Sequence, residues 1–373
     1  MLNIFYLISS RGWGGMEMHP FVLARGLAER GHSVIFGLSA GSRMSRFARE
    51  HGFSHLSLPF RWYLDRATYA GLRRHLRKQK VDVLHLHYSR DAWQALLLAG
   101  IFRRRVPLVF TRHMCSPAHR PKTDPLHRIL ARRLDAMVAI SGYVRRNSLL
   151  VYPIAEEKVR TVYYGLDRDV AGSPQGGRAV REKLGVGPEE ILIGMAAQLS
   201  PNKRQDLFLD AAELLLGDHP QARFVLAGAA ANRDYAEQIR SRAHQDGLAG
   251  RVILTGFWQD VPSLVQALDI ATLTSRAEAF GLVMIEALAN GRPFVGSRSG
   301  AVPEVIDHGR NGLLFEPGDP ADLARAWAEL VRDPQRRARI GEEGKKTFEE
   351  RFTLEREVEQ TEALYRSLIE RSS

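Results

Sequence analysis

The feature that most constrains the fold of this chain is a regular alternation of short β-like runs with amphipathic helical stretches. This pattern predicts parallel sheets whose strands are joined by crossover helices. In the first half, strands are predicted at residues 3–8, 33–38, 81–86, 108–111 and 136–140, and helices at 18–30, 67–79, 92–102 and 126–134. The pattern restarts with strands at 191–197, 223–227, 251–254, 270–273 and 294–297. We therefore expect an α/β protein with two doubly wound halves.

The boundary between the halves is predicted at residues 169–190, which contain Ala-Gly-Ser-Pro-Gln-Gly-Gly and have the composition of a linker. The N-terminal domain is then residues 1–168 and the C-terminal domain residues 191–350. Residues 351–373 contain a charged amphipathic helix. The sequence of this helix allows it to pack either on the second domain or back on the first domain.

The composition excludes several classes of protein. The 373 residues are 45% apolar and 25% charged, as in a globular protein of two domains. No apolar run approaches the roughly 18 residues that span a bilayer. Residues 2–8 predict a first strand, not a signal peptide, because they lack a basic leader and a cleavage site. The single Cys115 excludes an internal disulfide and fits a reducing cytoplasm.

The charge is distributed unevenly along the chain. Residues 1–180 contain 29 Lys and Arg against 12 Asp and Glu, a balance of +17, whereas residues 181–373 have 24 against 30, a balance of −6. This asymmetry favours an anionic partner for the first half: a membrane, a nucleic acid or a phosphorylated acceptor. The alternative is a general richness in arginine without a partner.

The most informative local sequence is the stretch of residues 275–293. It predicts a strand end, a glycine turn and a short helix that is stopped by a glycine with a proline just beyond. The start of a helix offers unpaired N–H groups and a positive dipole end. The backbone of Phe280, Gly281 and Leu282 is therefore predicted to hold a phosphate.

Two glutamates, Glu278 and Glu286, flank this helix start. A bound phosphate repels a carboxylate beside it, so both glutamates suit the hydroxyls of a sugar or ribose on either side of the phosphate. The simpler alternative is an ordinary strand–helix junction with solvated glutamates. The specific interpretation is a nucleotide-sugar site.

The pattern E-x-F-G-x4-E at residues 278–286, followed by G-A-V-P-E-V at 300–305 and G-L-L at 312–314, resembles the donor site of the family-four retaining glycosyltransferases. The resemblance extends from the glycine loop near residue 14 to the final helix. It implies the GT-B fold, in which two Rossmann-like domains face a cleft. It also implies that the final helix crosses back to the N-terminal domain.

The resemblance assigns residues in several loops. Gly14 and Gly15 match the family's glycine loop, which faces the donor phosphates, and His113 matches a histidine near the transferred sugar. Lys203 falls where the family has a lysine that clamps the diphosphate. Gln198 replaces the family's usual arginine, and a neutral amide binds phosphate more weakly than the charged guanidinium group of an arginine.

The resemblance also implies roles in catalysis. Glu278 would orient the sugar hydroxyls and Glu286 the ribose, while Lys203 and the helix start at 280–282 stabilise the leaving diphosphate. The loop at residues 255–261 falls where the base stacks. The implied reaction is metal-independent, uses no cofactor besides its nucleotide-sugar substrate, and proceeds on the front face of the sugar.

Two other kinds of chemistry suggested by the residues lack a complete set of groups. His85, His87 and His113 are candidate metal ligands, but no cluster of aspartates or cysteines completes a ligand set. A nucleophilic pair of Cys115 with His113 lacks an orienting third group.

The alternatives left open are a nucleotide-sugar epimerase or a sugar phosphorylase on the same fold, and a basic nucleic-acid-binding α/β protein. The basic residues are scattered over separate helices and form no stripe, so we expect no nucleic acid partner. We expect an anionic, membrane-borne acceptor of the lipopolysaccharide or cell-envelope type. The protein would be cytoplasmic and peripheral on the inner membrane face, with Phe60, Trp62 and Tyr63 at a headgroup interface beside the helix at 67–79.

Overall fold

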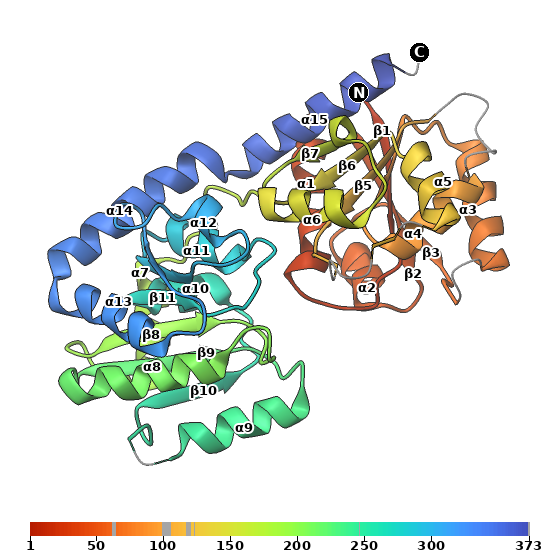
Figure 1. Cartoon of the computed structure of the whole chain (residues 1–373). Coiled ribbons are helices and arrows are strands. Elements are labelled where there is room, and N and C mark those ends of the chain that lie inside the picture. Colours follow the sequence, from red (N-terminus) through yellow and green to blue (C-terminus); the bar gives the residue numbers. More distant parts are fainter. Residues whose placement is uncertain (62–64, 99–105, 117–120, 123, 246, 372–373) are drawn as a thin grey trace. The chain divides into compact units, whose positions relative to one another are not determined.

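The structure is a computed structural model that describes residues 1–61, 65–98, 106–116, 121–122, 124–245 and 247–371. Its contacts divide the chain into two compact units (Figure 1). The first comprises Met1–Gly165 together with Leu354–Ser373, and the second comprises Leu166–Thr353. Each unit contains a parallel sheet with helices packed on it.

The sheet of the first unit is wholly parallel. Over the described residues it has seven strands in the order β3-β2-β1-β4-β5-β6-β7. They are β1 (Asn3–Ile8), β2 (Ser33–Ser39), β3 (His55–Leu58), β4 (Val83–Leu86), β5 (Leu108–Arg112), β6 (Ala136–Ala139) and β7 (Val159–Thr161). The strand order reverses between β1 and β4. Ligands of open parallel sheets bind at such a point, outside the carboxyl ends of the strands.

The sheet of the second unit follows the same plan. In the described part of the chain it has six parallel strands in the order β10-β9-β8-β11-β12-β13. They are β8 (Ile191–Ala196), β9 (Ala222–Ala227), β10 (Val252–Gly256), β11 (Ile270–Leu273), β12 (Phe294–Ser297) and β13 (Leu313–Phe315). Here the order reverses between β8 and β11.

Helices connect the strands in both units. The first unit contains α1 (Gly15–Glu29), α2 (Arg43–Glu50), α3 (Arg66–Lys78), α4 (Ser89–Leu98), α5 (Pro125–Arg133), α6 (Gly142–Val151), the short η1 (Glu156–Lys158) and α15 (Leu354–Glu370). The second contains α7 (Pro174–Leu184), α8 (Gln205–Asp218), α9 (Arg233–Ala243), α10 (Val261–Ala267), α11 (Leu282–Ala289), α12 (Val302–Val305), α13 (Pro320–Arg332) and α14 (Pro334–Arg351). Many begin at a capping side chain, such as Ser42, Asp65 and Ser141. None of the helices found over the described residues has the length and hydropathy needed to cross a bilayer.

The predicted fold class, two parallel α/β halves, is confirmed by these sheets. The sequence missed β3, β7 and β13, each of which has three or four residues. The predicted helix at residues 92–102 coincides with α4 up to Leu98, and its remaining residues lie outside the described part of the chain.

The segment 169–190 is not a linker, because it contains α7, which packs on α10. Ser173 caps this helix by accepting a hydrogen bond from Gly176 N at 3.0 Å. A Cβ atom on Gly177 would lie 2.9 Å from Gln266 Cγ, so the absence of a side chain there permits close helix packing. The glycines that suggested a linker therefore serve the contact between two helices.

The helix α15 completes the core of the first unit. It packs along α1 and buries Leu354, Val358, Tyr365 and Leu368 among residues of β1, β2 and α1. A Cβ atom on Gly26 of α1 would lie 2.6 Å from Val358 Cγ2, so α1 and α15 approach closely at this glycine. Burial of each large apolar side chain stabilises the fold by about 1.5–3 kcal/mol. The first unit therefore depends on α15 for its stability.

Candidate functional site

The loop between β1 and α1 contains the two predicted glycines. Gly14 is the N-cap of α1 and Gly15 is its first residue. The loop is held by the buried Glu17, which accepts hydrogen bonds from Tyr88 Oη at 2.6 Å and from Ser10 Oγ at 3.0 Å. Tyr88 follows β4, so Glu17 joins the loops after β1 and β4 where the strand order of the first sheet reverses.

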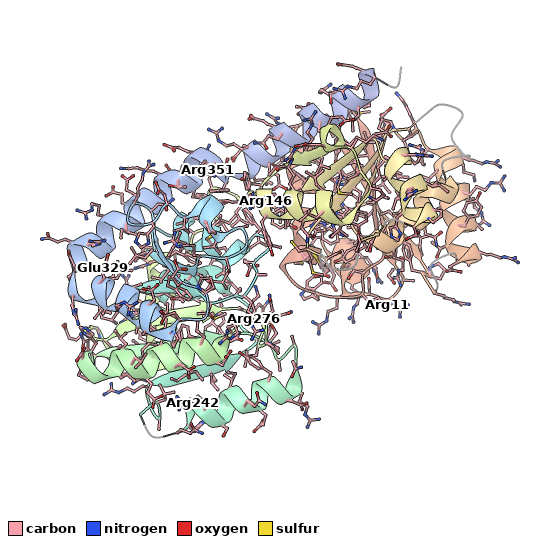
Figure 2. The ribbon with its side chains drawn as sticks, in the orientation of Figure 1. Arg11, Arg146, Arg242, Arg276, Glu329 and Arg351 are labelled. Carbon is pink, nitrogen blue, oxygen red and sulfur yellow. The ribbon has the colours of Figure 1, made fainter. Side chains whose placement is uncertain are left out.

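Asp91 joins the same two loops a second time. Its buried carboxyl accepts hydrogen bonds from Ser9 N at 3.1 Å and from Tyr88 N at 3.0 Å. Burial raises the pKa of this carboxyl to about 7, against the hydrogen bonds that lower it. Arg11, labelled in Figure 2, is exposed and donates to Ser39 Oγ at 3.2 Å. The backbone of the glycine loop is thus fixed while Arg11 faces solvent.

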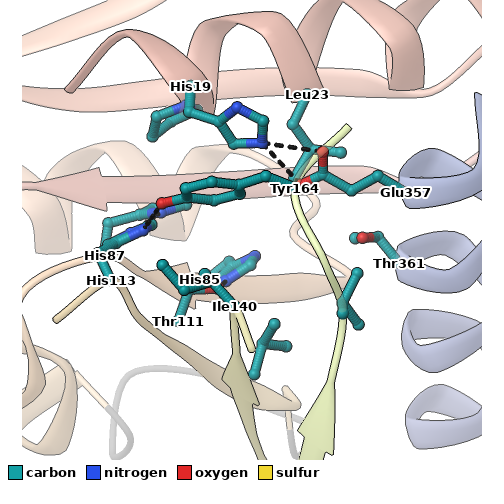
Figure 3. A pocket seen from close by; sticks show the side chains of 13 residues that line it. His19, Leu23, His85, His87, Thr111, His113, Ile140, Tyr164, Glu357 and Thr361 are labelled. Atoms are coloured by element: carbon teal, nitrogen blue, oxygen red, sulfur yellow. Dashed lines mark hydrogen bonds and ion pairs between the residues drawn. The ribbon is translucent and has the colours of Figure 1, made fainter. Parts of the chain in front are cut away.

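His113 directly follows β5, and its ring turns inward (Figure 3). The residue is only 7% exposed. Nε2 lies 3.1 Å from His87 Nδ1, and Nδ1 is hydrogen-bonded to Tyr164 Oη. Burial, followed by the charges of neighbouring residues, lowers the pKa of the ring well below its ordinary value. The sequence suggested a histidine presented at the strand exit, whereas in the structure both ring nitrogens are engaged.

The cavity beside His113 has a volume of about 10 Å³ and is also lined by residues of α1 and α15 (Figure 3). His19 Nε2 lies 2.8 Å from each carboxylate oxygen of Glu357. Glu357 also accepts a hydrogen bond from Gly165 N at 2.7 Å. The rings of His19 and Tyr164 lie against each other, with their centroids 3.8 Å apart.

The neighbouring His85 and His87 do not form a metal site. His85 Nδ1 lies 2.5 Å from Tyr365 Oη and Nε2 lies 2.6 Å from Thr111 Oγ1. Burial lowers the pKa of His85 to about 3, so the ring is neutral. Across the described residues, no group of His, Cys, Asp and Glu side chains has an arrangement that could hold a metal ion.

In the second unit, Lys203 and Glu278 meet where the strand order reverses. Lys203 lies in the loop after β8 and Glu278 in the loop after β11. Lys203 Nζ lies 2.6 Å from Glu278 Oε2, and the two side chains are 24% and 10% exposed. The loops are also joined by the backbone, since Arg276 N donates to Asn202 O at 2.8 Å. The structure thus brings together two residues that the sequence predicted separately.

The position of Glu278 is set by its neighbours. Ser275 Oγ donates to Glu278 Oε2 at 2.8 Å, and Ala301 N donates to the Glu278 carbonyl at 2.9 Å. A Cβ atom on Gly300 would lie 2.3 Å from that carbonyl oxygen, and the φ of Gly300 is +60°. A larger residue at position 300 would therefore displace the loop that carries Glu278.

The helix α11 begins directly after this loop. Gly281 is its N-cap, in the left-handed region with a φ of +85°, and Leu282 is its first residue. The side chain of Phe280 is buried, and its ring lies 6.0 Å from the ring of Phe352. The predicted phosphate-holding segment is therefore anchored by a core side chain, with the start of α11 beside Glu278.

Two other predicted ligands flank this region. Glu286 lies on α11 and is partly buried, and burial raises the pKa of its carboxyl to about 7. Gln198 is exposed in the loop after β8, where its backbone carbonyl accepts a hydrogen bond from Gln205 Nε2 at 3.0 Å. Because this contact uses only the backbone of Gln198, its side chain stays on the surface.

The predicted base loop follows β10. Phe257 is 67% exposed, whereas the Trp258 indole donates to the Asp260 carbonyl at 3.0 Å. Lys183 Nζ lies 4.7 Å from the centre of the Trp258 ring. Phe257 therefore presents a ring to solvent, and Trp258 packs within the unit.

Family models match both halves of the chain. The model described as Glycosyltransferase Family 4 matches residues 13–170, and that described as Glycosyl transferases group 1 matches residues 178–347. The matches include the glycine loop, Lys203 and the loop of Glu278.

The chain belongs to the family-four glycosyltransferases.

This glycosyltransferase is similar along nearly its whole length to N-acetyl-alpha-D-glucosaminyl L-malate synthase of Bacillus anthracis. The two are 27% identical, over 95% of this chain and 94% of the relative. It is also 28% identical to the lipopolysaccharide core biosynthesis mannosyltransferase LpsB of Rhizobium meliloti, over 77% of this chain and 80% of the relative.

Solved structures with the same fold confirm that the glycosyltransferase is a GT-B protein. The crystal structure of Anabaena Alr3699/HepE in complex with UDP matches with a TM-score of 0.86 and 25% identity, over 98% of this chain and 100% of that one. The glycosyltransferase from Rickettsia africae matches with a TM-score of 0.88 and 18% identity, over 99% and 98% of the two chains.

Several residues of the glycosyltransferase that shape these loops were not predicted. They are Glu17, Tyr88, Asp91, Tyr164, Ser275 and Glu357. Glu17 and Ser275 lie within predicted motifs, and their position in those motifs could have identified them as site residues. The others act through partners distant in sequence and carry no local pattern.

Proposed function

We propose that this glycosyltransferase moves a sugar from a nucleoside diphosphate sugar to a hydroxyl of an anionic glycan or lipid acceptor. It would retain the anomeric configuration and require no metal ion. The observation that carries the proposal is the Lys203–Glu278 pair at the strand-order reversal of the second sheet. A cation for phosphate and a carboxylate for hydroxyls are the groups that a nucleotide sugar requires. The Anabaena relative, crystallised with UDP and with UDP-glucose, supports this class of donor.

Donor binding would give each member of the pair a new partner. In the structure, Lys203 and Glu278 neutralise each other at 2.6 Å. A bound donor offers its diphosphate to Lys203 and its sugar hydroxyls to Glu278. The helix start at residues 280–282 adds backbone N–H groups for the phosphate. Glu286 on the same helix would accept hydrogen bonds from the ribose, and the exposed Gln198 side chain would reach the diphosphate.

The proposed reaction needs no second carboxylate. The acceptor oxygen attacks the anomeric carbon from the face that the diphosphate leaves, the bond from that carbon to the diphosphate oxygen breaks, and a leaving phosphate oxygen takes the acceptor's proton. Lys203 and the start of α11 stabilise the charge that develops on the diphosphate. In the first unit, we assign Gly14 and Gly15 to close backbone approach to the phosphates, and His113 to the transferred sugar.

A donor panel tests this proposal. Nucleoside diphosphate sugars, starting with UDP-glucose, are screened by thermal shift in EDTA, because a ligand that binds only the folded state raises its stability. Proton NMR of the product then gives the anomeric configuration. An inverted product would refute the retaining reaction. An epimerised donor formed without an acceptor would indicate an epimerase, and a phosphate-dependent product a phosphorylase.

The acceptor proposal rests on charge. Arg73, Arg74, Arg77 and Lys78 are all exposed on α3, in the half of the chain with a balance of +17. Each basic residue near an anionic surface contributes about 1 kcal/mol, so a few suffice for reversible attachment. Relatives from two Rhizobium species are lipopolysaccharide core mannosyltransferases, which supports a cell-envelope acceptor met by a cytoplasmic protein at the inner membrane face.

The aromatic part of this acceptor prediction needs correction. Phe60 is only 2% exposed and is a core residue, so it does not rest at a headgroup interface. Trp62 and Tyr63 lie outside the described residues. The membrane proposal therefore rests on charge and on the relatives, without an aromatic contribution from Phe60.

Vesicle sedimentation tests the membrane proposal. The protein is expected to bind anionic vesicles at low salt and to be released as salt rises. Replacing Arg73, Arg74 and Arg77 by Gln is expected to weaken this binding. The matched control replaces three basic residues of the second unit by Gln, Arg240, Arg325 and Lys346, which are 52%, 68% and 57% exposed. Equal behaviour towards neutral and anionic vesicles, or equal effects of the two sets of substitutions, would overturn the proposal.

A further inference from the structure

A chain of polar side chains in the first unit runs from α15 to His113 (Figure 3). Glu357, in the first turn of α15, binds His19 of α1 through both carboxylate oxygens at 2.8 Å. The His19 ring lies against the Tyr164 ring, and Tyr164 Oη is hydrogen-bonded to His113 Nδ1. Four side chains that are distant in sequence thus form one contact path.

This path begins where the chain passes between the two units. Tyr164 precedes Gly165, the last residue of the first stretch of the first unit, and α15 begins where the chain returns at Leu354. Gly165 N donates to Glu357 Oε2 at 2.7 Å, which fixes the backbone next to Tyr164. His19, Tyr164 and Glu357 are each at most 5% exposed. The Tyr164 ring is therefore held both through its backbone and by contact with the tilted His19 ring.

We propose that Tyr164 is a positioning residue of the glycosyltransferase reaction, which holds the His113 ring in one orientation and one neutral tautomer. The inference rests on the proposed function through the role given there to His113. A neutral imidazole has one donor and one acceptor nitrogen. The group that binds Nδ1 therefore decides whether Nε2 is the donor or the acceptor. The His87 ring on the Nε2 side does not decide this, because two neutral imidazoles have the same strength as donors and as acceptors. A phenolic O–H is a stronger acid than an imidazole N–H, so the Tyr164 hydroxyl donates to His113 Nδ1 and leaves the proton of the ring on Nε2.

The electrostatics of the site agree with a contact between neutral groups. Burial raises the pKa of the Tyr164 hydroxyl well above its ordinary value. Burial also lowers the pKa of His113 well below its ordinary value. Since neither group is charged near neutral pH, hydrogen bonding and not charge fixes where the protons lie.

The test compares Tyr164→Phe with Tyr365→Phe. Tyr365 is a matched control, because it is also buried and its Oη bonds a neighbouring histidine, His85, at 2.5 Å. Each substitution removes one buried hydroxyl from one histidine and leaves an aromatic ring in place. Histidine tautomers are read from long-range proton–nitrogen NMR spectra of protein labelled with nitrogen-15 histidine.

In the wild-type protein, His113 is expected to show one neutral tautomer. In Tyr164→Phe the His113 resonances are expected to move towards those of a mixture of the two neutral tautomers. The kcat of this variant is expected to fall about tenfold or more, with the donor KM within about twofold of the wild-type value. In Tyr365→Phe only the His85 resonances are expected to move, with kcat within about twofold. An unmoved His113 spectrum in Tyr164→Phe, or an equal loss of kcat in both variants, would overturn the proposal.

Glu357→Gln provides a second variant should Tyr164→Phe fold poorly. Its amide keeps an oxygen for Gly165 N but loses the charge that holds His19. The His113 resonances are expected to shift in the same direction as in Tyr164→Phe, and no shift would count against the path. If the wild-type protein turns over no donor, the proposed function fails, whereas the tautomer measurement still decides whether Tyr164 holds His113.

Discussion

Lys203→Ala is expected to weaken the binding of nucleoside diphosphates and to lower the free energy of unfolding of the protein alone. Lys203 Nζ lies 2.6 Å from Glu278 Oε2. Loss of a charge-assisted hydrogen bond to a diphosphate costs about 1.5–3 kcal/mol, which raises Kd about 10- to 150-fold. The Glu278 side chain is 10% exposed and would keep Ser275 Oγ at 2.8 Å but lose its cation. Because Lys203 is 24% exposed, we expect a loss of about 1–2 kcal/mol in unfolding.

Isothermal titration with UDP and urea denaturation measure the two effects separately. In Lys203→Ala/Glu278→Gln the free energy of unfolding is expected to recover, since no uncompensated carboxylate remains, while UDP binding stays weak. Lys346→Ala is the control, because Lys346 forms a similar pair with Glu343 at 2.7 Å on an exposed face. We expect it to leave both quantities unchanged. Wild-type UDP affinity in Lys203→Ala would refute the diphosphate role, and wild-type stability would refute the reasoning about the pair.

The remaining predictions concern metal, pH and the departure from the family pattern. Thermal stabilisation by UDP is expected to persist in excess EDTA, and its disappearance would indicate a metal. Gln198→Arg is expected to lower the Kd for UDP, because a charged fork binds phosphate about twice as strongly as an amide; titration showing no gain would place Gln198 away from the diphosphate. Burial raises the pKa of Glu286 to about 7, so UDP affinity is expected to rise as this carboxyl ionises between about pH 6 and about pH 8. For the same reason, folding stability is expected to fall as pH rises from the ordinary glutamate pKa through about 7. Glu286→Gln should flatten both profiles, and an unchanged profile in that variant would exclude Glu286 as their source.

The sequence predicted the long buried elements well and the short ones poorly. Residues 4–8 of the first strand form a continuous buried run because both faces of a parallel sheet are covered. By contrast, Val159–Thr161 offers three residues, too few for any periodicity. The error at α7 has a different origin. Local composition does not show that Gly177 packs against Gln266, a residue far along the chain.

The candidate site divides in the same way. The motif and its resemblance singled out Lys203 and Glu278, but their ion pair depends on the adjacency of β8 and β11, which only the strand order provides. The inward turn of the His113 ring was equally hidden, because its partner Tyr164 is 51 residues away in sequence. Glu357 lies in an ordinary amphipathic helix, and nothing local distinguishes it from a surface glutamate.

The discontinuity of the first unit has a consequence for how the protein is made. Residues 1–165 leave the ribosome before the second unit, yet part of their core, including Tyr365 and Leu368, is supplied by α15, which follows the second unit. Translation at about 5–20 residues per second delivers α15 only after the whole second unit has emerged. The second unit is continuous and folds from what has already been synthesised. The first unit is therefore completed after the second, and during this interval the residues of α1 around Gly26 lack the α15 side chains that cover them in the folded protein.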